Sequence, residues 1–471
     1  MPDLLGWTQV CGALDERGLL QCRASGAGSL LEGAPVTRIG STSLDAVERL
    51  LVGLCRRDAG AVVATADLAQ LSRKSFRNGL VVLASRHRVA GLMLVALQRH
   101  PGWGEIPSAI ADDLLRPGAG GEAPGRGAPL GDGVRPSDRV RSFDALLSGA
   151  QRKDLEIERV LGRLQAEGLE PVVLKGPALR RTVYAHPVER HYSDFDLLFP
   201  VEHVDPAIEV MSAAGYAFPF SPEKLQGYRQ LHFHVVLRQP RHFRAEIHWG
   251  LSRSRSPFQL DPKAFLRRSV KAPPTHAMPM RIPCPEHLLL HMAHENLRDS
   301  FSRFSRIVDV DRIVASTPDL DWDYSVSQAR DGGLESLLAL SLELSRELLA
   351  TAVPPHVLAS LRPGAATRMH LRLMQPAPAL IRWWLRDVGA AGSLQFWLSA
   401  GLRRRARLLL RLLGGMQSAE GWIFRESDQG PPTAREALAA GLKSGARLAS
   451  HHAALYWNGL REMTSAFRLR R

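Results

Sequence analysis

Cysteine and long apolar runs are both scarce in this sequence. Its 471 residues include only four cysteines, and none of them forms a Cys-x-x-Cys pair. A zinc knot or a disulfide framework is therefore not expected, and a reducing compartment fits. No run of about 18 uncharged apolar residues occurs, which argues against a membrane span. Because no N-terminal segment combines basic residues, an apolar run and a cleavage site, we expect a cytoplasmic protein.

Lysine is also scarce, although the chain is strongly basic. Seven of the 61 basic residues are Lys and the other 54 are Arg, with a formal charge of +14 and a pI of about 10.2. A charge of this sign is compatible with a nucleic-acid partner. However, dominant Arg together with abundant Ala, Gly, Leu and Pro is typical of a general composition bias. Nucleic acid therefore stays an alternative partner that we do not favour.

The remaining composition is that of a globular protein, with 45% hydrophobic and 23% charged residues. A chain of this length favours two or three domains. Residues 1–42 show no sustained period, and we expect them to be disordered. The rest divides into a helical domain at 43–116, a Gly/Pro-rich linker at 117–136, a long helix at 137–168, a core at 169–283 and a helical domain at 284–471.

The core alternates between strand and helix patterns. Short apolar or alternating runs predict strands at Pro171–Lys175 and Ser193–Phe199, with helices at Pro177–Tyr184 and Val204–Ala214. Two further alternating runs separated by Gln-Pro-Arg, between His232 and Trp249, predict a β-hairpin. We therefore expect an α+β fold, in which a small mixed sheet is flanked by N- and C-terminal helical domains.

Acidic residues occupy alternate positions of one predicted strand. Asp194 and Asp196 would share a face, with Phe195 pointing the opposite way. Two carboxylates about 4 Å apart repel by roughly 4 kcal/mol at an effective dielectric constant near 20, so such a pair favours a cation between them. Glu246 projects from a later strand between two apolar residues, and three carboxylates suit Mg²⁺. The alternative is an ordinary polar face of an exposed strand.

Residues around this pair support the cation hypothesis. Lys175 and Gly176 end the upstream strand, where a glycine that opens a helix lets backbone N–H groups approach a phosphate. Arg190 lies four residues before Asp194 and could neutralise phosphate charge. His248 would share the strand face of Glu246, either as an outer partner of the metal ligands or as a core residue.

Together these features resemble the polymerase β-like nucleotidyltransferase superfamily, and more closely the bacterial uncharacterised nucleotidyltransferase family. The matching segments are Val172-Val-Leu-Lys-Gly-Pro-Ala-Leu179, Tyr184, Arg190, Ser193-Asp-Phe-Asp-Leu-Leu198 and Glu246-Ile-His-Trp249. With weaker helical flanks, the resemblance spans roughly residues 43–410. It implies transfer of a nucleotidyl group from an NTP, with ATP expected, to a small-molecule or peptide acceptor. A peptide or natural-product biosynthetic pathway is the setting that the resemblance suggests.

The resemblance also implies roles for individual residues. Asp194, Asp196 and Glu246 would hold two Mg²⁺ ions, and Glu246 would help deprotonate the acceptor hydroxyl. Lys175, Gly176, Arg190 and Ser193 would bind the NTP. Pro177 departs from the wider superfamily, in which Ser or Gly follows the glycine, so one N–H and a hydroxyl are missing. Two alternatives stay open: a catalytically silent accessory protein, which Pro177 motivates, and a nucleic-acid-modifying nucleotidyltransferase, which the basic charge of the chain motivates.

Other polar or aromatic residues have more ordinary interpretations. Three histidines share one face of a predicted helix: His287, His291 and His294. They could hold a metal ion, but packing or contact with substrate is favoured. Charged residues further along could hold an acceptor or pair with one another (Arg306, Asp309, Asp311 and Arg312). We interpret the basic segment 402–413 as a helix that buries Leu, and Trp383-Trp384 as a packing anchor.

Overall fold

The fold comes from a computed structural model, which describes residues 41–115, 143–218, 225, 229, 232–239, 244–253, 256–272, 279–298, 301 and 303–361. The chain divides into two compact units, Met1–Gly149 and Ala150–Arg471. The segments 1–40, 117–136 and 362–471 lie outside the described residues. The sequence predictions for these segments therefore lie outside the described residues: disorder over 1–40, the linker, the helical domain beyond 361, the basic segment 402–413 and the Trp383-Trp384 anchor.

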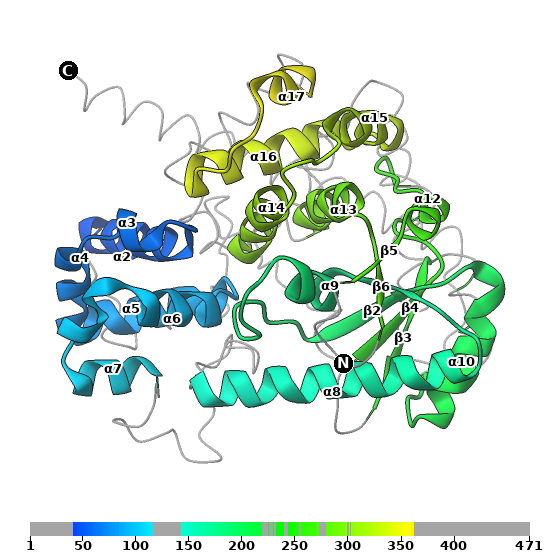
Figure 1. Ribbon diagram of the computed structural model, residues 1–471, viewed down its shortest axis with the longest axis horizontal. Coiled ribbons are helices and arrows are strands. Elements are labelled where there is room, and N and C mark those ends of the chain that lie inside the picture. Colours follow the sequence, from blue (N-terminus) through cyan, green and yellow to red (C-terminus); the bar gives the residue numbers. More distant parts are fainter. Residues whose placement is uncertain are drawn as a thin grey trace, which may run out of the picture. The chain divides into compact units, whose positions relative to one another are not determined.

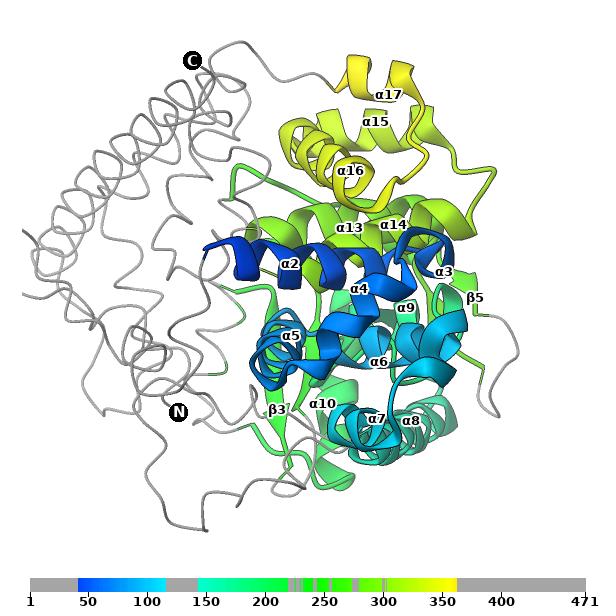
Figure 2. The ribbon, with the colours of Figure 1, turned by 90° about the vertical axis from the view of Figure 1, so that its left-hand side faces the viewer.

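The first unit is helical in its described part. Its helices are α2 (Ser41–Cys55), α3 (Ala59–Val62), α4 (Thr65–Ala69), η2 (Gln70–Ser72), α5 (Lys74–Arg86), α6 (Ala90–Arg99), η3 (Pro101–Glu105) and α7 (Ser108–Leu115). Figure 2 shows α2, α5 and α6 near one another, and their contacts bury Leu54, Leu80 and Leu97 completely. The helical pattern begins at Ser41, so Ser41 and Thr42 are helical and not disordered as expected.

The long helix α8 (Phe143–Ala166) leads into the second unit. Along its second half the buried side chains recur at helical spacing, in the order Ile157, Val160, Leu161 and Leu164. The helix ends just before Gly168, which adopts the left-handed conformation with φ of +73°. Both the helix and its glycine stop were predicted from the sequence.

One mixed sheet forms the centre of the second unit. Its strands are β1 (Val172–Leu174), β2 (Asp194–Leu198), β3 (His234–Arg238), β4 (Arg244–His248), β5 (Val270–Lys271) and β6 (Arg281–Ile282), in the order β3-β4-β2-β1-β6-β5. Strand β2 pairs with β4 in parallel and with β1 in antiparallel register. β3 and β4 form the predicted hairpin. The expected α+β class and mixed sheet are confirmed.

The two faces of the sheet have different environments. On one face, Phe195 and Leu197 are buried towards α10 (Val204–Ala213) and Tyr216, whose ring meets Phe195 edge-on. Figure 1 shows α10 and α8 on this side, and α9 (Lys175–Thr182) and α13 (Pro285–Arg298) on the other. The alternation of β2 therefore directs its aspartates towards α9 and α13.

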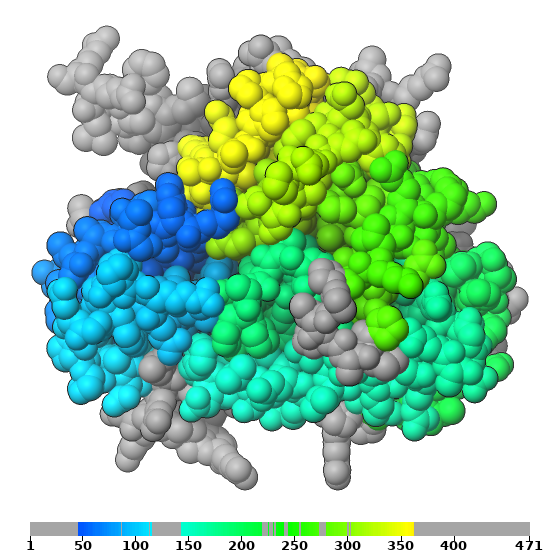
Figure 3. All heavy atoms as spheres, viewed as in Figure 1, coloured from blue at the N-terminus to red at the C-terminus, as the bar shows by residue number. Residues whose placement is uncertain are grey.

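Helices complete the second unit. They are α12 (Pro262–Arg267), α13, α14 (Phe304–Ser316), α15 (Trp322–Gly332), α16 (Glu335–Leu349) and α17 (Pro355–Ser360), with η5 (Val201–His203) preceding α10. Helices α13, α14 and α16 pack against one another, and the atoms of this group form a continuous surface in green to yellow (Figure 3). Across the described ranges, every helix is too short or too polar to cross a bilayer.

Candidate active site

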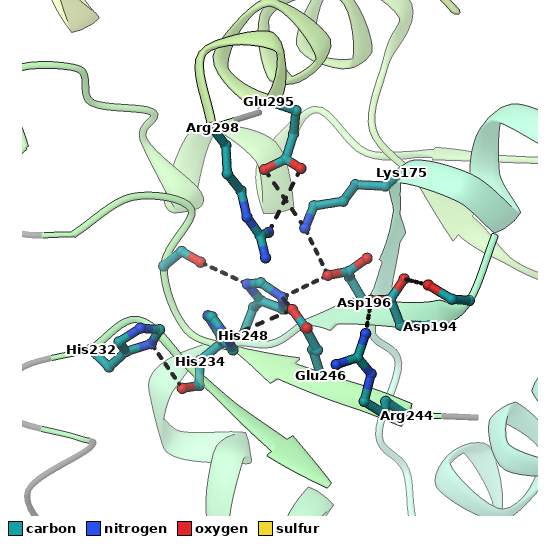
Figure 4. A network of polar contacts seen from close by, with 12 residues as sticks. Lys175, Asp194, Asp196, His232, His234, Arg244, Glu246, His248, Glu295 and Arg298 are labelled. Carbon is teal, nitrogen blue, oxygen red and sulfur yellow. Dashed lines mark hydrogen bonds and ion pairs between the residues drawn. The ribbon is translucent and has the colours of Figure 1, made fainter. Parts of the chain in front are cut away.

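The register between β2 and β4 brings the predicted carboxylates together. Because the two strands run in parallel, Asp196 lies opposite Glu246, and Asp194 lies opposite Arg244. Asp196 and Glu246 are almost completely buried, at 2% and 4% exposed. Figure 4 shows the side chains of Asp194, Asp196 and Glu246 on the same side of the sheet. The three acids that the sequence singled out thus share one site.

Lys175 supplies a positive charge to this site from the junction of β1 and α9. Its Nζ donates a hydrogen bond to Asp196 Oδ1 at 2.8 Å and lies 3.8 Å from Glu295 Oε1 on α13. Burial lowers the pKa of Lys175, but the charges of Asp196 and Glu295 raise it above its ordinary value. The ammonium is therefore firmly protonated at neutral pH.

The backbone of Lys175 is unusual as well. Its φ of +52° lies in the left-handed region, which costs a side-chain-bearing residue roughly 1–2 kcal/mol. Helix α9 begins at this residue, directly after β1. The chain therefore turns sharply enough to aim the lysine at the acids, and strain of this kind concentrates at functional sites.

His248 joins two of the carboxylates. Its Nε2 lies 3.0 Å from Asp196 Oδ1 and 3.2 Å from Glu246 Oε2, and the ring is 2% exposed. Burial lowers the pKa of His248, but the hydrogen bonds to these two carboxylates outweigh burial and raise it. Burial likewise raises the pKa of Glu246, whereas His248 and Lys175 hold it below its usual range. An ionised Glu246 at neutral pH follows.

Asp194 occupies the outer edge of the same site and is half-buried. Ser193 Oγ donates to its Oδ1 at 3.3 Å, and Arg244 Nη2 lies 3.6 Å from its Oδ2. Burial and the neighbouring charges of Asp196 and Glu246 raise the pKa of Asp194. A further positive charge placed between the acids would relieve this repulsion and favour the ionised carboxylate.

Two other predicted residues have evident structural roles. A Cβ on Gly176 would lie 2.5 Å from the Cβ of Tyr192, so close packing alone requires glycine there. The Arg190 guanidinium makes a two-fold hydrogen bond to Asp309 on α14, at 2.7 and 2.8 Å, and also donates to the carbonyl of His191. These bonds already occupy the Arg190 guanidinium. Its expected contact with a phosphate stays a prediction.

Three residues of the site were missed from the sequence. Arg244 occupies the alternate position before Glu246 on β4, so strand periodicity alone could have indicated it. His234 lies opposite His248 across the hairpin, which the turn length could have suggested. Glu295, held by Arg306 at 2.9 Å and by Arg298 at 3.7 Å, comes from a distant helix. No local pattern points to Glu295.

Burial lowers the pKa of all three histidines of α13, and two of them contact Phe265. The His287 ring stacks on Phe265 with centroids 4.2 Å apart, and its Nε2 shares a hydrogen bond with the Tyr324 hydroxyl. Burial lowers its pKa to about 4. His291 meets the same phenylalanine edge-on, and burial, reinforced by the charge of Lys175, lowers its pKa to about 3. For His294, burial lowers the pKa to about 4.

The geometry is that of an acidic pair on one strand, a third acid on its parallel neighbour, and a lysine at a strand–helix turn. Residues 142–350 match an uncharacterised nucleotidyltransferase family. The predicted resemblance is confirmed over this segment, which is shorter than the span expected from the sequence. The nucleotidyltransferase match supports nucleotidyl transfer as the general activity. No curated protein and no solved structure matches the chain.

Proposed function

We propose that this protein moves a nucleotidyl group from an NTP, with ATP expected, to a hydroxyl of a small-molecule or peptide acceptor, with the help of divalent cations. The observation that carries the proposal is the pairing of Asp196 with Glu246 across β2 and β4. Asp194 lies on the same face, and Lys175 reaches Asp196. We assign cation binding to the three carboxylates, as the sequence predicted.

The donor set fits such cations. Carboxylate oxygens from two neighbouring strands converge here, and oxygen is the ligand that Mg²⁺ prefers. Burial and the like charges of Asp196 and Glu246 raise the pKa of Asp194, and a cation bound beside it would oppose both effects. Bound cations would supply Lewis-acid stabilisation of charge on the α-phosphate and on the leaving pyrophosphate.

Lys175 would act as the phosphate ligand of the site. In the structure its ammonium is paired with Asp196. When Asp196 takes a cation as its partner, Lys175 can turn the same charge towards the negatively charged phosphates. Arg244, whose side chain is 44% exposed beside Asp194, is placed to contribute a second charge at the rim.

The backbone at the start of α9 would support this contact only in part. The first N–H groups of a helix have no partner within it and attract anions. Pro177, at the third position of α9, has no N–H to offer. Gly176 and Ala178 keep theirs, so phosphate binding would depend more on Lys175 than on the backbone.

Glu246 is better suited to cation binding than to proton transfer. A general base works best when its pKa is near the working pH, whereas His248 and Lys175 hold the pKa of Glu246 low despite its burial. The carboxylate therefore stays ionised but accepts a proton poorly. We assign Glu246 to the cations and give it no more than a minor part in deprotonating the acceptor.

Labelled nucleotides test the proposal directly. The protein is incubated with each labelled NTP, Mg²⁺ or Mn²⁺, and a cell extract that supplies acceptors. We expect a labelled product from wild type and a loss of more than about 100-fold in the double variant Asp194→Asn plus Asp196→Asn, because one electrostatic donor alone is worth 10²–10³ in rate. Asp323→Asn, at an exposed carboxylate on α15, is the matched control and should retain activity.

Either of two results would contradict the proposal. Full metal-dependent transfer by the double variant would show that Asp194 and Asp196 are not needed as cation ligands. Nucleotide binding by wild type without turnover, for every NTP and extract tried, would favour the silent accessory form that Pro177 motivates.

A further inference from the structure

Three buried side chains on the hairpin β3–β4 form a cluster beside the aspartates. His234, Glu246 and His248 each offer a ligand atom, and these atoms all lie within 4.8 Å of one another. The three residues are 8%, 4% and 2% exposed. Figure 4 shows them on the side of the sheet that carries Asp196. Two imidazoles and a carboxylate form a donor set that proteins use for catalytic zinc.

The strand register explains why the cluster forms. His234 is paired with His248 across the antiparallel strands, so the two rings stack with centroids 4.7 Å apart. Glu246 lies two residues before His248 and therefore points from the same face. The backbone of a rigid hairpin thus fixes all three side chains, which is the arrangement that a preorganised metal site requires.

The distances agree with shared coordination. His234 Nε2 lies 3.7 Å from Glu246 Oε2, which is too long for a hydrogen bond. Two ligands of a tetrahedral ion with bonds of 2.0–2.1 Å lie about 3.4 Å apart. The separation of 3.2 Å between His248 Nε2 and Glu246 Oε2 is close to that value. Asp196 Oδ1, 3.0 Å from His248 Nε2, is within reach as a fourth ligand.

The hydrogen bond on the far side of His248 orients its ring for coordination. Nδ1 lies 3.3 Å from the carbonyl oxygen of Gly250, an acceptor that can only receive a proton. With the proton on Nδ1, Nε2 faces two carboxylate oxygens, so either a second proton or a metal cation lies between them. A carbonyl behind a histidine ligand is the usual outer partner of a metal site.

We propose that His234, Glu246 and His248, with Asp196 within reach, bind a divalent transition-metal ion such as Zn²⁺ in preference to Mg²⁺. Imidazole nitrogen suits zinc, whereas Mg²⁺ selects oxygen ligands. The inference rests on the proposed function, because Asp196 and Glu246 are assigned to the cations there as well. It adds which class of ion one of the cation positions selects.

A proton on Nε2 of His248 is the competing explanation. It would satisfy His248 and the two carboxylates, but it would leave His234 without a role. His234 is 8% exposed and lies opposite His248 across the hairpin. Its Nδ1 is buried and has no hydrogen-bond partner among the described residues. A neutral imidazole beside a carboxylate is a ready metal ligand.

Cobalt is the probe that distinguishes the two explanations. Metal-free protein is titrated with Co²⁺ alone, and the visible d–d absorption is followed. We expect saturable binding with a tetrahedral spectrum, displacement by Zn²⁺, and resistance to excess Mg²⁺. His234→Gln should weaken Co²⁺ binding by at least about tenfold, since even outer partners of a metal contribute 10–100-fold. His287→Gln, at a buried histidine outside the cluster, is the matched control.

The outcomes for this inference and for the proposed function are separable. Wild type that gives no tetrahedral Co²⁺ spectrum, or a folded His234→Gln that binds Co²⁺ as wild type does, would overturn the inference. If His234→Gln does not fold, the wild-type spectrum and its competition by Mg²⁺ still decide. Nucleotide transfer supported by Mg²⁺ in protein that binds no Co²⁺ would leave the function intact and refute the inference. Co²⁺ binding without transfer would do the reverse.

Discussion

The ion pair between Arg190 and Asp309 should contribute to folding and not to phosphate binding. Asp309 is fully buried, and its two oxygens accept hydrogen bonds from Arg190 at 2.7 and 2.8 Å. Tyr184 donates a third hydrogen bond to the same carboxylate at 2.7 Å. Asp309→Asn would leave the buried guanidinium without its counter-charge. Breaking a buried pair in this way costs about 3–5 kcal/mol.

A set of compensating variants separates the charge from the packing. Arg190→Met plus Asp309→Leu removes both charges, so the largest penalty disappears. Tyr184 would then lose its acceptor, which costs about 1–3 kcal/mol for a buried hydroxyl. Adding Tyr184→Phe should bring the free energy of unfolding back to within about 1 kcal/mol of wild type, since apolar replacements of a buried pair are often neutral.

Urea denaturation followed by tryptophan fluorescence measures these differences. We expect the order wild type, triple variant, double variant, and Asp309→Asn as the least stable. The loss in Asp309→Asn should change little between low and high salt, because a buried pair is poorly screened. A loss below about 0.5 kcal/mol in Asp309→Asn, together with weaker NTP binding by Arg190→Met, would refute the structural role and restore the predicted phosphate contact.

Two further substitutions test the packing of the second unit. Burial disfavours the charged ring of His287 and lowers its pKa from the ordinary value of 6.5 to about 4 in the folded protein. Between these two values the unfolded chain binds more protons than the folded one, so the free energy of unfolding falls as the pH drops through this range. The contribution reaches at most about 3 kcal/mol, and the free energy of unfolding of His287→Gln should therefore depend less on pH; equal slopes would contradict this. Gly176→Ala should destabilise the protein by about 1–3 kcal/mol in thermal unfolding, because the added Cβ would collide with Tyr192. Gly104→Ala is the control and should leave stability unchanged, because a Cβ there meets no atom within 4 Å. Wild-type stability in Gly176→Ala would show that the turn can relax.

Local sequence patterns predicted the parts of the fold that depend on local physics. Alternation along β2 identified which side Asp194 and Asp196 share, because a strand turns its side chains by half a turn at each residue. The glycine stop of α8 follows from the left-handed conformation at Gly168. The hairpin was evident from its two alternating runs and short connection. Each of these features is encoded within a few neighbouring residues.

Features that depend on distant partners were not predictable in the same way. Asp309 lies 119 positions beyond Arg190, so nothing near Arg190 indicated that its charge is neutralised inside the core. The parallel register of β2 with β4 is likewise set by the whole sheet, and it alone places Arg244 beside Asp194. The left-handed backbone also falls on Lys175 and not on the glycine that follows it. Local propensity favours glycine there, and tertiary structure prevails.

The balance of charge explains how the site can hold several buried acids. Asp196 and Glu246 are almost inaccessible, and each faces a cation, Lys175 or His248, that the protein itself supplies. Without these partners, burial would penalise both charges, because a carboxylate loses its hydration inside the protein. Under the proposed function, a bound cation would replace Lys175 beside Asp196, and a phosphate of the NTP would take the place of Asp196 beside Lys175. The partners would then change while the charge of each buried group stays balanced, and Glu295 would remain beside Lys175.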